Sequence, residues 1–179
     1  MTSNRTLFSA LALLALPGAL AAQHGQRDHQ PMPEQGTAPQ TPVYLMKAGA
    51  SDLFERQSGQ LLSTSRNPGI ARFAREMVRE MVRDHTNSTA MVKAAAMRSG
   101  LHPKPPMLDR DMSRDLAALR AARGRDRDRL YVMQQKKAHQ DALMLQQGYA
   151  TGGDNPALRG AAGKIVPVVQ HHIAMLDRM

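Results

Sequence analysis

Three histidines and one glutamate are the residues whose types and spacing could do chemistry: Glu55, His85, His139 and His172. Imidazole and carboxylate groups are ligands that suit zinc, iron or copper. Each histidine lies in a segment with helical periodicity. His85 and His172 have apolar residues four and seven positions away on the same stripe, and the stripe of His139 is more polar but compatible with the same orientation. This spacing predicts that all three histidines point into a helical core.

The glutamates do not have the spacing of a di-iron centre. Helical bundles build such centres from Glu-x-x-His pairs on two helices. The positions three residues after the glutamates of the helical region hold one serine and two arginines: Ser58, Arg79 and Arg83. A mononuclear or dinuclear transition-metal site remains one interpretation. The missing spacing favours the other, in which buried histidines and a glutamate are hydrogen-bonded to one another.

A second group of candidates combines methionine with histidine and aspartate, and it adds these secondary metal ligands: Asp84, Met81, His171 and Met175. Thioether and imidazole groups suit copper(I) in a chain without cysteine. Methionine also fills irregular helical cores. With so few clustered methionines, ordinary core packing is the favoured interpretation.

The N-terminus predicts export. Residues 1–21 combine Arg5, an apolar run from Leu7 to Leu16 and a small-residue triplet, as secretory signal peptides do. No later stretch is long and apolar enough to span a membrane. We therefore expect a periplasmic or secreted protein, with a flexible leader at residues 22–41 that is rich in proline and glutamine.

The charge balance is basic, with a formal net charge of +9. The chain has no tryptophan and only three phenylalanines and three tyrosines, so it lacks the stacking surfaces of single-strand nucleic-acid binders. An exported basic protein meets anionic envelope surfaces instead. We expect such a surface as a partner, and no nucleic acid; the oligomeric state is left open.

The elements that must position the inward residues are helices, predicted over residues 43–64, 68–100, 109–123, 126–149 and 156–179. Asn67-Pro68 and Asn155-Pro156 are typical helix starts, and Gly100 is a typical stop. No segment alternates as strands do. The fold class predicted for residues 42–179 is all-α, an up-down four-helix bundle with one additional short helix.

Several motifs resemble a bacterial exported family, domain of unknown function 4142: Ala48 to Glu55, Arg72 to Ala74, Met81 to Thr86, and Pro167 to His172. The resemblance implies a ferritin-like fold and supports Glu55, Asp84 and the three histidines as recurrent polar positions. Two departures stand out. The repeated Arg-Glu-Met-Val of residues 75–82 looks like an inserted helical turn, and Ala138 stands where an aspartate would precede His139.

The expected function is that of a non-enzymatic, envelope-associated binding or stress-related protein. The alternative is a metal-binding or redox protein that uses the inward glutamate and histidines. No phosphate-binding loop or hydrolase motif is found in the sequence.

Overall fold

The computed structural model describes residues 38–179, except for the side chains of Val78, Met81 and Val82. This part of the chain contains helices and no strands, which confirms the all-α prediction. The five helices are α1 (Thr41–Leu62), α2 (Pro68–Arg98), α3 (Arg110–Ala121), α4 (Gly124–Gly152) and α5 (Pro156–Leu176). The predicted signal peptide and nearly all of the predicted leader lie outside the described residues.

The helices begin where the sequence places capping side chains. The Asn67 side chain accepts hydrogen bonds from the amides of Gly69 and Ile70, and Asn155 accepts one from Leu158. Both caps precede a proline, whose missing N–H is not needed in the first turn. The start of α1 differs from the prediction, because Thr41 is already helical and its hydroxyl bonds to Asp154 instead of capping.

The connection between α2 and α3 begins at Gly100, which adopts a φ of 72°. This left-handed conformation costs a glycine little, and it lets the amide of Leu101 bond back to the carbonyl of Ala96. Residues 101–109 then continue without helix, as their three prolines predict.

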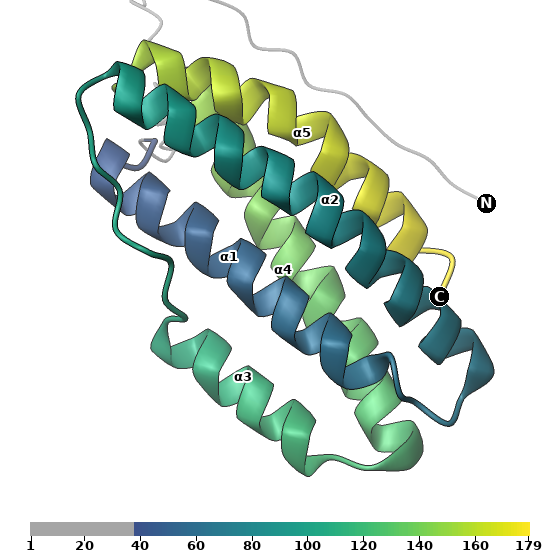
Figure 1. Cartoon of the computed structure of the whole chain (residues 1–179). Helices are drawn as coiled ribbons and strands as arrows, with labels where there is room; N and C mark the ends of the chain where they lie inside the picture. Colours follow the sequence, from purple (N-terminus) through teal and green to yellow (C-terminus); the bar gives the residue numbers. More distant parts are fainter. Residues whose placement is uncertain (1–37) are drawn as a thin grey trace, which may run out of the picture. The chain divides into compact units, whose positions relative to one another are not determined.

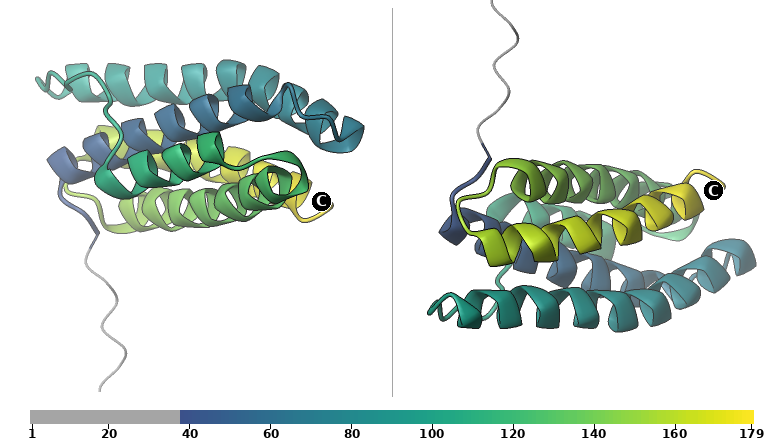
Figure 2. Two further views of the ribbon diagram at one scale, coloured as in Figure 1. Left: turned by 90° about the horizontal axis from the view of Figure 1, so that it is seen from below. Right: turned by 90° about the horizontal axis from the view of Figure 1, so that it is seen from above.

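The four long helices form two antiparallel hairpins, α1 with α2 and α4 with α5 (Figure 1). Helix α1 also packs on α4, and α2 packs on α5, so the four surround one core. Helix α3 belongs to the long crossover between the hairpins and covers α1 and α4 (Figure 2). Because α3 runs back along the bundle, α2 and α4 point in the same direction (Figure 1).

Apolar clusters lie towards both ends of the core. One contains Tyr44 and Tyr149, whose rings stack with centroids 3.8 Å apart. The other contains Leu62, Met77 and Leu176, all without exposed surface. Each fully buried leucine of this kind stabilises the fold by about 2 kcal/mol. Glu55 lies between these clusters on α1, so the middle of the core is a polar layer. No helix of residues 38–179 has the length and apolar character needed to cross a membrane.

Candidate metal centre

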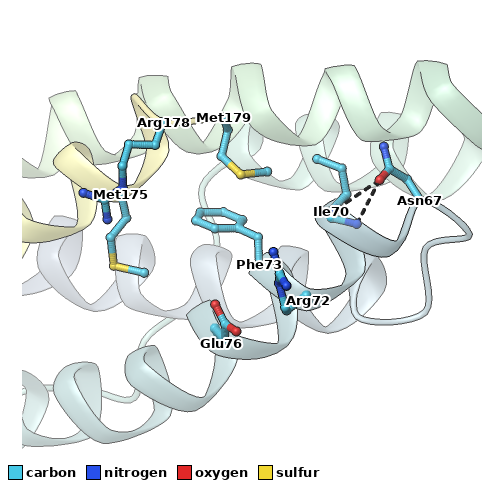
Figure 3. A pocket seen from close by; sticks show the side chains of 9 residues that line it. Asn67, Ile70, Arg72, Phe73, Glu76, Met175, Arg178 and Met179 are labelled. Carbon is cyan, nitrogen blue, oxygen red and sulfur yellow. Dashed lines mark hydrogen bonds between the residues drawn. The ribbon is translucent and has the colours of Figure 1, made fainter.

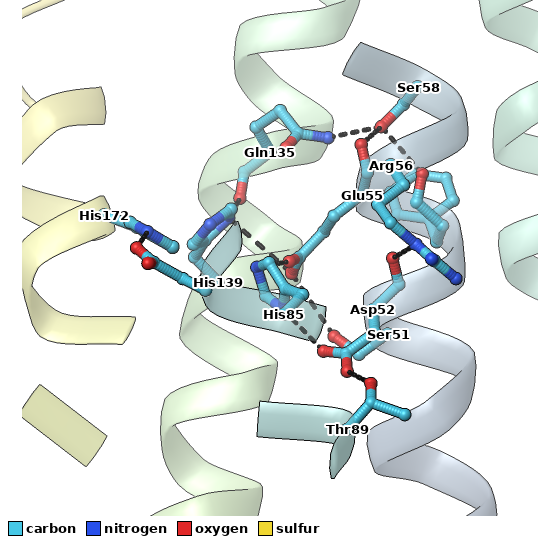
Figure 4. Close-up of polar contacts among 12 residues, drawn as sticks. Ser51, Asp52, Glu55, Arg56, Ser58, His85, Thr89, Gln135, His139 and His172 are labelled. Atoms are coloured by element: carbon cyan, nitrogen blue, oxygen red, sulfur yellow. Dashed lines mark hydrogen bonds and ion pairs between the residues drawn. The ribbon is translucent and has the colours of Figure 1, made fainter. Parts of the chain in front are cut away.

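Each long helix contributes one buried ionisable residue to the polar layer, and these are the four primary candidates of the sequence: Glu55 from α1, His85 from α2, His139 from α4 and His172 from α5 (Figure 4). Only His85 has measurable exposure, at 6%. The ring centroid of His172 lies 5.5 Å from that of His85 and 5.5 Å from that of His139.

The buried face of α1 holds Glu55 in place. Ser51 donates a hydrogen bond to Glu55 Oε1 at 3.3 Å. One turn further on, Ser58 Oγ accepts a hydrogen bond from Gln135 Nε2 at 2.8 Å and so ties α1 to α4 (Figure 4). Ser51, Ser58 and Gln135 are all buried, as is Glu55.

His85 is held from outside the cluster by Asp52. The Asp52 Oδ1 atom lies 2.6 Å from His85 Nδ1, and Thr89 Oγ1 donates to Asp52 Oδ2 at 2.6 Å (Figure 4). The other ring nitrogen, Nε2, lies 3.0 Å from Glu55 Oε2. A carboxylate on the outer nitrogen of a histidine fixes the ring and its tautomer, as second-layer carboxylates do in metal sites.

The contact between His85 Nε2 and Glu55 Oε2 is an ion pair without the alignment of a hydrogen bond. Neither atom has a hydrogen-bond partner within the described residues, although the two lie 3.0 Å apart. Both atoms are therefore still available to interact with a third group, through a lone pair or a proton.

His139 and His172 also keep nitrogens without partners. His139 Nδ1 donates to the carbonyl of Gln135 at 2.9 Å, which leaves Nε2 unpaired within the described chain. His172 Nε2 lies 3.4 Å from Asp84 Oδ2, too poorly placed for a hydrogen bond, and neither of its nitrogens is hydrogen-bonded to a described residue.

The charges of the layer depend on one another. Burial raises the pKa of Glu55, but the charges of His139, His85 and His172 outweigh it and lower the pKa to about 2. Burial lowers the pKa of His85, but the hydrogen bond to Asp52 and the negative charges of Asp52 and Glu55 raise it to about 10. Near neutral pH, Glu55 is therefore an anion and His85 a cation.

His172 behaves in the opposite way to His85. Burial lowers its pKa, and repulsion from His139 and His85 lowers it further, to about 4. His172 is therefore neutral at pH 7. A neutral imidazole keeps the lone pair that a metal ion requires.

The secondary candidates of the sequence are separated by the fold. Asp84 reaches the layer, but beside His172 and not beside its sequence neighbour His85. His171 is exposed. Met175 packs with the cluster of Phe73 and Met77 and lines an open cavity near the C-terminus (Figure 3). The side chain of Met81 lies outside the described part.

Asp52 is the member of the site that the sequence interpretation missed. It lies three residues before Glu55 and so on the same side of α1, and this spacing is the signal that could have found it. The second missed partner, the Gln135 carbonyl, leaves no signal in the sequence because every residue has a carbonyl. The Gln135 carbonyl accepts a hydrogen bond from His139, just as the Asp52 carboxylate accepts one from His85.

Taken together, the three histidines could hold a metal ion. One ring nitrogen from each lies within 4.8 Å of the others. Buried polar atoms are usually paired, and unpaired ones cost about 1–3 kcal/mol each. The donor set, three imidazoles beside one carboxylate, is one that transition metals accept. The free nitrogens of the layer thus fit a metal ion as their shared partner.

Comparison with known protein families identifies a family for this chain. The family described as Domain of unknown function (DUF4142) matches residues 26–179. The chain belongs to this family. No curated protein and no solved structure matches the chain. The matched region thus includes helices α1 to α5 and the whole polar layer.

Proposed function

We propose that this DUF4142 domain is a ferritin-like bundle that binds one divalent transition-metal ion through Glu55, His85, His139 and His172. The observation that carries the proposal is the set of buried ring nitrogens without hydrogen-bond partners among the described residues, one or more on each histidine. The ferritin-like assignment is supported by the two hairpins and the single long crossover between them.

The alternative of a purely structural histidine cluster explains the layer less well. Histidines kept only for packing would be expected to pair with one another or with Glu55. His85 does form an ion pair with Glu55, but His139 Nε2 and both nitrogens of His172 lack hydrogen-bond partners within the described residues, although neither side chain has exposed surface. A metal ion would supply a partner to all three rings at once.

Binding requires a small contraction of the layer. Nitrogen ligands lie about 2.0–2.1 Å from zinc, so two ligand atoms of one ion are about 4 Å apart at most. The ring nitrogens are separated by up to 4.8 Å. Small rotations of the rings would bring the three nitrogens to bonding distance of one ion. His85 would lose its proton in the process, so metal binding is coupled to proton release.

Four protein ligands indicate binding or storage and not catalysis. Catalytic zinc sites keep a coordination position open for water or substrate, whereas closed sites have four protein ligands. Glu55 is the only fully buried glutamate of residues 38–179, so the layer lacks the glutamates of a di-iron centre. We therefore assign a non-enzymatic role to the domain.

Metal titration tests the proposal. The metal-free protein is titrated with Zn²⁺, Cu²⁺ and Fe²⁺, and bound metal is measured after gel filtration for the wild type, His172→Ala and His171→Ala. The neighbouring His171 is exposed, so His171→Ala is a matched control. We expect one tightly bound ion per chain in the wild type and the control, and loss of that ion in His172→Ala. Equal binding by His172→Ala, or no stoichiometric ion in the wild type, contradicts the proposal.

We also propose that the domain works in the periplasm or outside the cell. This rests on the signal-like residues 1–21 of the sequence. The mass of the protein recovered from the periplasm should correspond to a chain that starts at Ala22 or Gln23. Recovery of the whole chain from the cytoplasm would refute it.

A further inference from the structure

A groove runs between α1, the second half of α2 and the connection of residues 101–109, which we call the strap. It consists of two adjoining cavities of about 350 and 550 Å³. Both volumes are in the range of small-molecule sites. The two cavities share five lining residues: Leu45, Pro103, Lys104, Pro105 and Pro106. They therefore lie next to one another along the strap.

The walls of the groove are mostly apolar. Leu45, Val92 and Ile165 line the inner part, together with the prolines of the strap, which have no N–H to donate. At the outer part, Met46 and Met107 are 60% and 76% exposed. Methionine side chains adapt to the shape of an apolar ligand. Such walls favour a flexible hydrocarbon chain over a polar ligand.

The free charge of the groove is positive. Lys47, Lys93 and Lys104 line it, and none forms an ion pair with a carboxylate of the described residues. The two acidic residues of the lining are already engaged. Asp52 bonds to His85 and Thr89, and Asp109 caps α3 through the amide of Met112. An anionic group is the complement that these lysines lack.

The strap is attached weakly enough to admit a ligand. After Leu101, no backbone N–H of residues 102–108 donates a hydrogen bond within the described chain. The strap instead rests on α1 where Pro106 meets Gly49, since a Cβ at residue 49 would lie 2.9 Å from Pro106 Cβ. Local opening is easiest in segments with few hydrogen bonds.

We propose that this groove binds a free fatty-acid anion, with the hydrocarbon chain between α1 and the strap and the carboxylate at the lysines. The site is separate from the metal ligands, although Asp52 lines one and supports the other. Binding of the fatty acid needs no metal, so the His172→Ala variant can be used to test it as well as the wild type can.

The experiment measures binding of dodecanoate below its micellar concentration by calorimetry, on the whole exported chain. Dodecyltrimethylammonium has the same chain and the opposite charge, and decanoate has two fewer methylenes. The charge variant replaces Lys47, Lys93 and Lys104 by glutamine. The matched control replaces three lysines of α4 and α5 that do not line the groove: Lys136, Lys137 and Lys164.

We expect saturable binding of one dodecanoate per chain. The charge variant should bind about tenfold more weakly, since each exposed pair adds a little. Decanoate should bind the wild type about tenfold more weakly, since two methylenes leave the groove wall. The control variant should bind as the wild type does. Equal binding of the cationic amphiphile, or an equal loss in both lysine variants, would overturn the proposal. So would the absence of saturable binding.

Discussion

Replacement of Glu55 by glutamine should separate the charge of the polar layer from its shape. The substitution keeps the volume and the acceptor for Ser51, but removes the anion opposite His85. A pKa lowered from 4.5 to about 2 corresponds to about 3 kcal/mol of stabilisation at neutral pH. Removal of one partner from a buried ion pair generally costs about 3–5 kcal/mol of stability, which agrees with this value. We expect metal-free Glu55→Gln to be about 3 kcal/mol less stable than the wild type at pH 7.

The pH dependence gives a second, independent signature. The pKa of His85 is raised from 6.5 to about 10, so its contribution is fully present below pH 6.5 and is lost as the pH rises towards 10. Wild-type metal-free protein should therefore lose stability across this window. Glu55→Gln should lose less across it, because only Asp52 then favours the protonated ring.

Urea unfolding of the metal-free proteins at pH 5.5, 7 and 9, followed by circular dichroism, measures both effects. Glu76→Gln is the matched control, since Glu76 is exposed on α2 and its loss should change stability by less than about 0.5 kcal/mol. The reasoning is refuted if Glu55→Gln costs less than about 1 kcal/mol and keeps the wild-type slope between pH 7 and 9.

Three further predictions concern other parts of the domain. Asn155→Ala should lower the free energy of unfolding by about 1 kcal/mol, measured in urea, because the amide of Leu158 loses its cap. Gly100→Ala should cost at least about 1 kcal/mol in the same assay, because φ is 72° there; an unchanged midpoint would mean that α2 does not end in this conformation. The pKa of His172 is lowered from 6.5 to about 4, so the melting temperature of the metal-free protein should fall as the pH drops through this window, where the unfolded chain takes up the proton first. His172→Asn should show a shallower fall.

The sequence predicted the inward positions well because helical periodicity needs no tertiary information. His85 and His172 fall on stripes of apolar residues, His139 falls on a more polar stripe of the same spacing, and such a stripe faces a core wherever the helix packs. The helix starts at Asn67 and Asn155 were predicted for the same reason, since a cap acts within one turn. These features depend on residues close in sequence, and the structure confirms each of them.

Helical periodicity could not predict which side chains contact one another across helices. Asp84 precedes His85 but lies beside His172 of α5, because consecutive residues of a helix point about 100° apart. His85 is held instead by Asp52 of another helix. Whether buried histidines pair with one another or leave nitrogens free depends on ring orientations, which no spacing rule gives. The missing Glu-x-x-His spacing, which favoured a hydrogen-bonded core, carries no information about these orientations.

The charge of the layer argues for a divalent ion in particular. Asp52 and Glu55 flank His85 and carry two negative charges, while Asp84 is already neutralised by Arg83 at 2.9 Å. In the metal-free state the protonated His85 offsets one of these two charges. A divalent ion that displaces this proton would offset both, and Glu55 would then bind the ion directly. A monovalent ion such as copper(I) would restore only the balance that the proton already provides, and it prefers sulfur ligands that these four side chains do not supply.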